Sequence, residues 1–302
     1  MTGLSQEAFS EQPIQGQSPI LGQPDQERLL HPDGTITIEI DKIPNDGITV
    51  LSDTHFAQLG PWHNMSPKVL DKIIGLKTGI IIFNGDIFDF HVQSNPEVTL
   101  EKLRYMLDTL DQRIREGNDT LQRVIFNEGN HDPKHLLAEA LAEYSNFEIA
   151  DRVVIENRIE IKHGHKEAPS PLDAAGREKL AKELVNSKIL GNTLGKIAGD
   201  VLSKIKFKGF NAVIWDIYLG RLPHSRLWPR GLRSKFVVQV NPLEAAANGS
   251  EVEQTIFGHA HVPAVNGRYF NTGYFQKNPG QRARLWSIKI MHDMPPVLEK
   301  LH

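Results

Sequence analysis

Short apolar runs alternate with amphipathic segments along most of the chain. The apolar runs are four to eight residues long, contain many Val, Ile and Phe residues, and are bounded by Gly, Asn, Asp or Pro, which is typical of β-strands. One of them predicts a hairpin, with its turn at Glu156-Asn157 in RVVIENRIEIKHG. The predicted strands lie at residues 35–40, 47–53, 79–86, 123–130, 152–164 (the hairpin), 252–259, 268–273 and 284–290.

Three segments between these runs have helical periodicity. In the first, SPKVLDKIIGLK, Ser66 is the predicted N-cap and Pro67 the first helical residue. The second, residues 96–117, places five apolar side chains on one face, and the third is residues 133–144. The five are Leu100, Leu103, Leu107, Leu110 and Ile114. Strands alternating with helices predict an α/β fold, with mixed sheets covered by helices.

The N-terminal segment, residues 1–34, is rich in Gln, Pro and Gly and has no sustained period, so we expect a disordered tail. The chain has 302 residues, 39% of them hydrophobic, which suffices for a sizeable core over residues 35–300. It contains no cysteine, which excludes disulfides, thiolate metal sites and cysteine nucleophiles. No apolar run approaches the length of a membrane span, so we expect a cytoplasmic protein.

Five of the predicted strands end in residues that bind metals well. Carboxylate, amide and imidazole groups suit zinc, manganese, iron or magnesium, and the ends of strands are where α/β folds build their sites. Each motif alone is weak, because a single Asp-x-His or Gly-Asp pair is usually ordinary turn chemistry, and Asp132 could simply cap the following helix. Independent turns give no reason for the same residue types at five strand ends. These residues are Asp53, Asp86, Asn130, His163, and the pair His259 and His261.

In this order, the motifs DTH, GDIFD, GNHD, KHGH and GHAH resemble the five signature blocks of the calcineurin-like metallophosphoesterase superfamily. The resemblance extends from Asp53 to His261. It implies a sandwich of two mixed β-sheets flanked by helices, with two divalent metal ions at the site. Such ions activate a water molecule for attack on phosphorus.

The resemblance also implies a ligand set. Asp53, His55 and His261 would hold one metal ion, whereas Asn130, His163 and His259 would hold the other. Asp86 would bridge the two ions.

It further implies a catalytic role for His131, which would stabilise the transition state or protonate the leaving group. Asp132 would orient the ring of His131 and could also cap the helix that follows. The family uses the histidine directly before Gly, so His163 is the expected ligand and His165 the expected substrate contact.

Residues 166–250 form a long insertion between two of the motifs. From Arg177 to Lys235 there are 13 Lys and Arg residues against four Asp and Glu, a net charge of +9, whereas the whole chain carries −3. Aromatic residues lie among these charges, so we expect a basic helical lid that contacts an anionic substrate or membrane surface. Equally, the charges could form a solvated helix face around a small core. Lys204, Lys206 and Lys208 are the expected substrate contacts.

This layout is most similar to the UDP-2,3-diacylglucosamine diphosphatases, peripheral membrane enzymes that usually use manganese. The stretch NTGYF at residues 271–275 fits this branch, whereas His131 departs from it, because arginine is common there. Manganese is therefore the expected metal, with iron, zinc and magnesium as alternatives. Two other functions stay open: a nuclease or nucleotide phosphodiesterase, whose basic insertion would bind nucleic acid, and a non-catalytic binding module.

Overall fold

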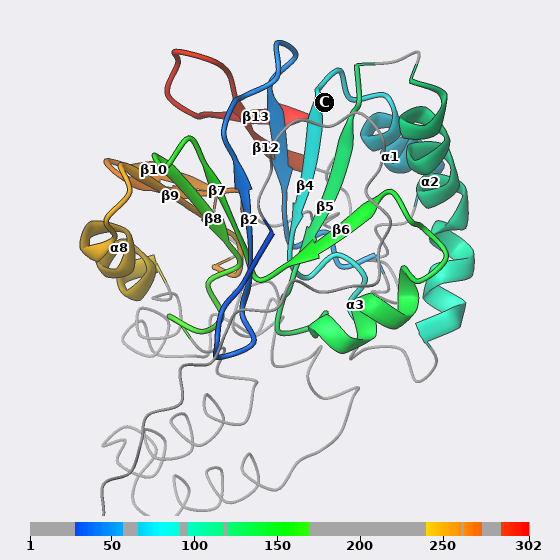
Figure 1. The fold of residues 1–302 in the computed structure, drawn as a ribbon, viewed down its shortest axis with the longest axis horizontal. Coiled ribbons are helices and arrows are strands. Elements are labelled where there is room, and N and C mark those ends of the chain that lie inside the picture. Colours follow the sequence, from blue (N-terminus) through cyan, green and yellow to red (C-terminus); the bar gives the residue numbers. More distant parts are fainter. Residues whose placement is uncertain are drawn as a thin grey trace, which may run out of the picture.

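The computed structural model describes residues 28–56, 66–90, 96–117, 120–168, 240–260, 263–273 and 285–301. Two β-sheets lie face to face, with helices on their outer sides (Figure 1). One sheet has six strands in the order β13-β12-β3-β4-β5-β6, and the other has seven in the order β1-β2-β7-β8-β9-β11-β10. Both sheets contain parallel and antiparallel pairs. The predicted α/β fold with two mixed sheets is therefore confirmed.

The six-stranded sheet contains the chain's most apolar strands. Its strands are β3 (Ile48–Leu51), β4 (Ile80–Asn84), β5 (Arg123–Asn127), β6 (Phe147–Ala150), β12 (Leu285–Ile290) and β13 (Val297–Leu301). Strands β3 to β6 are parallel neighbours in chain order, so their carboxyl ends share one edge. That edge carries the DTH, GDIFD and GNHD motifs, because each follows one of these strands directly.

Strand β4 shows how the sandwich is packed. All five of its residues are buried. Ile80 and Ile82 face the apolar layer between the two sheets, whereas Ile81 and Phe83 face the layer beneath the helices. A strand buried on both faces needs an unbroken apolar run, and IIIF supplies it.

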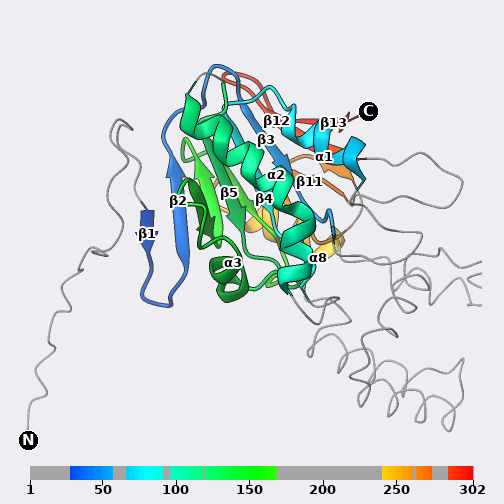
Figure 2. The ribbon, with the colours of Figure 1, turned by 90° about the vertical axis from the view of Figure 1, so that its right-hand side faces the viewer.

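Three helices cover the outer face of the six-stranded sheet (Figures 1 and 2). They are α1 (Pro67–Ile74), α2 (Pro96–Glu116) and α3 (Lys134–Ala140). The predicted apolar face of α2 is confirmed, because Leu103, Leu107 and Leu110 are buried there. Ser66 is the N-cap of α1 and Pro67 its first residue, as predicted, although the Ser66 side chain makes no capping hydrogen bond.

The seven-stranded sheet contains the predicted hairpin. Its strands are β1 (Arg28–Leu30), β2 (Ile36–Ile40), β7 (Arg152–Ile155), β8 (Ile159–Lys162), β9 (Gln254–Phe257), β10 (Ala264–Asn266) and β11 (Tyr269–Asn271). Glu156 and Asn157 form the turn between β7 and β8 with φ of 49° and 53°, the geometry of a tight hairpin. Helix α8 (Val240–Gly249) covers the outer face of this sheet through Leu243 and Ala247.

The predicted boundary of the tail is wrong. Strand β1 pairs with β2 from Arg28 to Leu30, and Gly34 (φ 82°) closes the turn between them. Backbone pairing with β2 orders a segment that lacks an apolar pattern of its own, and it places β1 at the outer edge of the sheet (Figure 2). Residues 1–27 lie outside the described residues, and so do residues 169–239 of the insertion predicted to form a lid (166–250). No helix among the described ranges is long and apolar enough to cross a bilayer.

Candidate metal centre

The loops that follow β3 and β4 are joined to each other by backbone hydrogen bonds. The amide of Asp53 donates to the carbonyl of Gly85 at 3.1 Å, and the amide of His55 donates to that of Asp86 at 3.0 Å. Both loops follow parallel neighbouring strands, so the sheet itself brings DTH and GDIFD side by side. The ring of His55 lies with its Nε2 atom 3.9 Å from Asp53 Oδ1.

Five residues of these motifs have a backbone conformation that non-glycine residues rarely adopt. Their φ angles are positive: Asp53 52°, His55 45°, Asp86 55°, Asp89 61° and His259 62°. Each such residue costs on the order of 1–3 kcal/mol, and such strain concentrates at functional sites. Here it turns polar side chains at strand ends toward one another.

Asp86 lies at the centre of the site. Its Oδ2 atom is 3.2 Å from His163 Nε2, and its Oδ1 atom accepts a hydrogen bond of 2.8 Å from the amide of His131. Burial opposes ionisation of Asp86, but the neighbouring imidazoles of His163, His131 and His55 hold its pKa well below the usual range. The carboxylate is therefore ionised at neutral pH.

Asp86 also belongs to two groups of potential metal ligands. One group is Asp53, His55 and Asp86, and the other is Asp86, His163 and His259. Within each group, one ligand atom per residue lies within 4.8 Å of the others. Because one carboxylate belongs to both groups, it has the placement that a bridge between two metal ions requires.

His163 is held so that one ring nitrogen faces the other ligands. Its Nδ1 atom is 2.8 Å from the carbonyl of Asn84, which fixes the proton there and makes Nε2 the ring nitrogen suited to a metal ion. Nε2 lies 3.3 Å from Oδ1 of Asn130 as well as close to Asp86. Gly85 (φ 79°) allows this approach, because a Cβ atom there would lie 2.5 Å from His163 Nδ1.

His259 is held in a similar way from the opposite sheet. Its amide donates to both carboxylate oxygens of Asp53, at 3.1 and 2.9 Å. Its Nε2 atom is 2.6 Å from the carbonyl of Ala168, so Nδ1 is the ring nitrogen suited to a metal ion. The side chains of Asp53, His163 and His259 are all buried. His261 lies outside the described residues, so its predicted role as a ligand stays a prediction.

A buried polar clamp beneath the site joins the two sheets. Asn127 on β5 donates through Nδ2 to Asn84 Oδ1 at 2.9 Å, and also to the carbonyl of Ile161 on β8. Asn84 in turn donates to the carbonyl of Lys162 at 3.1 Å, and Ser52 donates to the carbonyl of Asn84 at 2.9 Å. These bonds set the position of β8 just before His163.

The predicted partner of the His131 ring is wrong. Oδ1 of Asp89, not the Asp132 carboxylate, lies 2.6 Å from His131 Nδ1. Asp132 instead accepts hydrogen bonds from the amides of Ile87, Phe88 and Asp89, and so shapes the GDIFD loop. It also does not cap α3, whose N-cap residue is Pro133.

Asp89 is the site residue that the sequence reasoning missed. Its other oxygen lies 3.1 Å from Nδ1 of His55, so one carboxylate orients two imidazoles. Burial opposes ionisation of Asp89, but His131 and His55 lower its pKa below the usual range. In the other direction, Asp89 and Asp86 raise the pKa of His131 to about 10 against the effect of burial. The available signal was the second carboxylate of GDIFD, three residues after Asp86.

Of the four predicted substrate contacts, His165 lies within the described residues and the three lysines do not. The ring of His165 lies 5.5 Å from that of His163 and 6.5 Å from that of His259. Burial, followed by the charge of His163, lowers the pKa of His165 to about 4, so its ring is neutral. Lys204, Lys206 and Lys208 lie outside the described residues.

The donor set fits a pair of divalent metal ions. It consists of carboxylate, amide and imidazole groups, which suit manganese, iron, zinc or magnesium, and the imidazoles that face the cluster are oriented by other groups. The backbone is closely fitted around the carboxylates, because a Cβ atom at Gly129 or Gly258 would collide with Asp86 or Asp53, respectively.

The comparisons with known proteins agree with this geometry. The sequence profile of the calcineurin-like phosphoesterase family matches residues 47–263, which include all five motifs. A comparison with curated proteins finds no significant match. Members of the family are metal-dependent phosphoesterases, and this chain belongs to the calcineurin-like phosphoesterase family.

Proposed function

We propose that this enzyme hydrolyses a phosphodiester or diphosphate bond at a centre of two metal ions. Asp53, His55 and His261 would hold one ion, and Asn130, His163 and His259 the other. The observation that carries the proposal is the position of Asp86, whose carboxylate belongs to both groups of potential ligands. When bound, two divalent ions polarise the phosphoryl oxygens and lower the pKa of a water molecule.

His131 would donate the proton to the leaving oxygen. Its ring is oriented through Nδ1 by Asp89, and its amide is anchored on Asp86. Asp89 keeps the ring protonated, which is the form that a general acid requires. Asp132 would act indirectly, because it accepts hydrogen bonds from the backbone amides of the loop that carries Asp89.

The proposed metal is manganese and the proposed substrate a lipid-linked or nucleotide-sugar phosphate. The order of the motifs and the basic insertion support this choice, since 13 basic residues lie between Arg177 and Lys235. The same basic charge would also suit a nucleic acid backbone, which keeps a nuclease as the alternative. A hydrolysis screen with Mn²⁺ decides between them. It compares a nucleotide-sugar diphosphate, a lipid-linked diphosphate, a cyclic nucleotide and single-stranded DNA.

Charge reversal in the insertion gives a second test of the substrate. Replacing Lys204, Lys206 and Lys208 with Glu should weaken binding to anionic vesicles, and added salt should mimic the change, because exposed charges are screened over about 10 Å at 0.1 M salt. Phe207 and Phe210 are two of the aromatic residues among these charges, and replacing them with Ser should weaken vesicle binding with much less salt dependence. A wild-type protein that cleaves DNA and ignores both vesicles and acylated substrates would establish the nuclease instead.

A further inference from the structure

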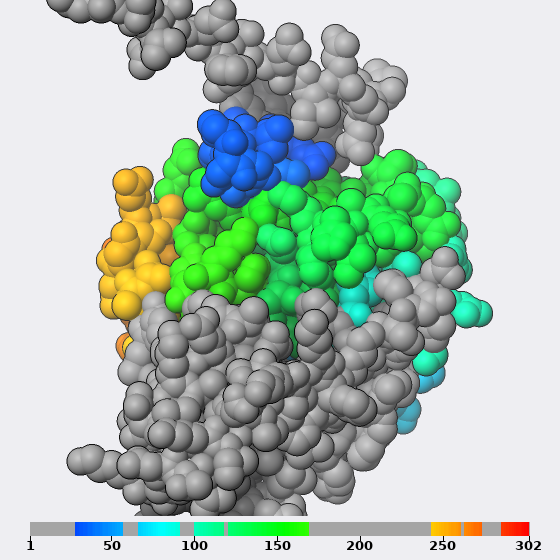
Figure 3. All heavy atoms as spheres, turned by 90° about the horizontal axis from the view of Figure 1, so that it is seen from below, coloured from blue at the N-terminus to red at the C-terminus, as the bar shows by residue number. Residues whose placement is uncertain are grey.

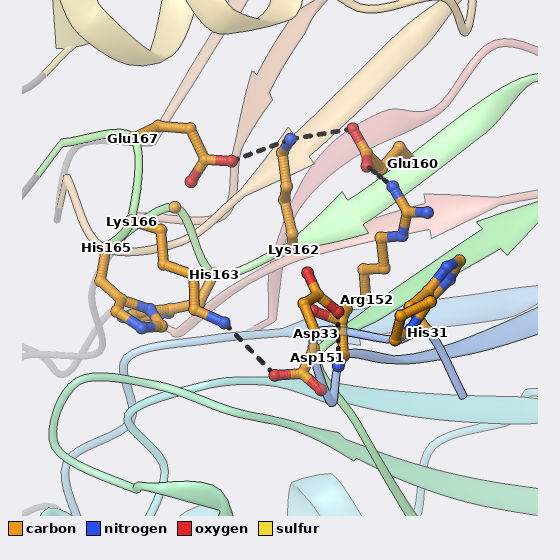
Figure 4. A pocket seen from close by; sticks show the side chains of 13 residues that line it. His31, Asp33, Asp151, Arg152, Glu160, Lys162, His163, His165, Lys166 and Glu167 are labelled. Atoms are coloured by element: carbon orange, nitrogen blue, oxygen red, sulfur yellow. Dashed lines mark hydrogen bonds and ion pairs between the residues drawn. The ribbon is translucent and has the colours of Figure 1, made fainter. Parts of the chain in front are cut away.

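A pocket of about 510 Å³ opens beside the candidate metal centre. It begins at His163 and His165, passes the ends of β7 and β8, and reaches the turn at residues 31–35 (Figure 4). Seen from below, the blue N-terminal part of the described chain borders the green part, which contains β7 and β8 (Figure 3). Pockets of roughly 300–1,000 Å³ are typical of small-ligand sites. His163 belongs both to the pocket and to the ligand cluster, so the pocket adjoins the candidate metal centre at this residue.

Most of the charged side chains of the pocket already form ion pairs. Lys162 lies 3.1 Å from Glu160 and 2.9 Å from Glu167, and Arg152 lies 3.3 Å from Glu160. On the other wall, Lys166 lies 3.3 Å from Asp151. Figure 4 shows these pairs facing the space between them. The walls therefore offer many hydrogen-bond donors and acceptors but little unbalanced charge.

This balance of charge decides which substituent fits. Four carboxylates, including that of Asp33, face three Lys and Arg cations, so a second phosphate group would meet no excess of positive charge. An acyl chain would remove water from ionised groups and form no hydrogen bonds in return, which is unfavourable. A neutral group with many hydroxyls, such as a sugar, can both donate to the carboxylates and accept from the cations.

His165 and Arg152 add unused hydrogen-bonding capacity to this pocket. Nδ1 of His165 is buried and has no hydrogen-bond partner among the described residues. Arg152 uses Nε for Thr37 and Nη1 for Glu160, and its side chain remains 39% exposed at the pocket. A buried polar atom without a partner is costly, and a hydroxyl group of a ligand would satisfy it.

We propose that this pocket binds the neutral, hydroxyl-rich group esterified to the phosphate that the metal centre cleaves. The assignment rests on the proposed phosphoesterase function, and it names the substrate class as a phosphorylated sugar or cyclitol. Arg152, His165 and Lys166 are then the residues that determine specificity for this group.

The test compares hydrolysis of two phosphodiesters by the Mn²⁺-loaded protein. Glycerophosphoinositol carries a hydroxyl-rich group, whereas bis(p-nitrophenyl) phosphate carries none. Arg152→Leu should lower kcat/KM for glycerophosphoinositol about tenfold more than for the nitrophenyl diester, the effect of one lost hydrogen bond to a charged group. Lys166→Met changes the opposite wall of the pocket. It should likewise lower kcat/KM for glycerophosphoinositol more than kcat/KM for the nitrophenyl diester.

Arg158→Leu is the matched control, because Arg158 lies at the other end of the β7–β8 hairpin. It is 53% exposed, pairs with Glu253 and does not line the pocket. It should leave the ratio of the two kcat/KM values unchanged. Thermal melting of all three variants checks that each is folded.

Three results would overturn the assignment. The first is an equal loss of kcat/KM for both diesters in both pocket variants. The second is a wild type that hydrolyses the nitrophenyl diester but not glycerophosphoinositol. The third is a larger loss of kcat/KM in the pocket variants for trithymidylate, a short nucleic acid, than for glycerophosphoinositol. If the wild type hydrolyses no phosphodiester, the proposed function fails instead. Calorimetric binding of glycerophosphoinositol then tests the pocket: Arg152→Leu should weaken binding about tenfold, and an unchanged affinity would refute the assignment.

Discussion

Asp89 Oδ1 lies 2.6 Å from His131 Nδ1, and Asp89 Oδ2 lies 3.1 Å from His55 Nδ1. One buried carboxylate thus orients the candidate general acid and a candidate metal ligand at the same time. The two functions predict two separable effects when the charge of Asp89 is removed.

Asp89→Asn should lower kcat about 100-fold or more, because His131 loses the partner that keeps it protonated and oriented. It should also weaken metal binding about tenfold through His55. Turnover at saturating Mn²⁺ isolates the first effect, and metal titration measures the second. A kcat that recovers fully at saturating Mn²⁺ would show that Asp89 serves only His55. Asp108→Asn, a change at an exposed position of α2 that keeps an acceptor for the Tyr144 hydroxyl, is the control.

His131→Ala and Asn130→Ala separate chemistry from metal binding. His131→Ala should lower turnover strongly with nearly unchanged metal content, whereas Asn130→Ala should lose one of the two metal ions. Elemental analysis and kinetics on the same preparations check both. The loss in His131→Ala should shrink for substrates with acidic leaving groups, which need no proton. An emptied metal position in His131→Ala would mean that the two assignments are reversed.

Asp86→Ala removes the carboxylate shared by both ligand groups. We expect loss of both metal ions and of hydrolysis, with the secondary structure retained, as judged by circular dichroism. Asp71→Ala, which removes an exposed carboxylate on α1, should leave metal content and turnover intact. Normal metal content in Asp86→Ala would contradict its role as a bridge.

His163 makes the stability of the chelator-treated protein depend on pH. Burial disfavours the charged ring, but Asp86 raises the pKa of His163 to about 9. A folded-state pKa above the ordinary 6.5 stabilises the fold fully below pH 6.5, and this contribution is lost as the pH rises through about 9. With chelator present, the melting temperature should therefore fall between pH 6.5 and 9.5.

Metal binding should show the opposite dependence on pH. A metal ion requires the neutral imidazole, so the stabilisation by added Mn²⁺ should grow over the same range. His163→Gln should reduce both trends, whereas His292→Gln, a change at an exposed surface position, should retain them. Parallel curves for wild type and His163→Gln would exclude His163 as their source.

Asn127→Leu breaks the clamp between the sheets while keeping the branched shape of the side chain. It leaves Asn84 Oδ1 and the carbonyl of Ile161 without their donor, which should lower the free energy of unfolding by about 1–3 kcal/mol. It should also weaken metal binding, because β8 positions His163. Asn146→Ala is the control, since the Asn146 side chain donates to Asp111 on the helical side of the six-stranded sheet. Destabilisation with unchanged metal affinity would limit the clamp to a structural role.

The local sequence determined most of the strands, helices α1 to α3 and the identity of most ligand candidates. The runs IIIF and RVIF are apolar enough to be buried on both faces, and the turn Glu156-Asn157 defines its hairpin, because these properties depend on neighbours in the chain. Parallel strands align their carboxyl ends, so motifs that follow them had to meet at one edge.

Only the tertiary structure decided which of these polar groups bond to one another. Asp89 and Asp132 both lie near His131, yet Asp89 bonds its ring and Asp132 bonds backbone amides more than 40 residues away in the chain. The tertiary structure also decided the pairing of β1 with β2 and the hydrogen bond between Asn127 on β5 and Asn84 on β4. Such contacts depend on the packing of whole strands and on strained loop conformations, which residue type and spacing along the chain do not specify.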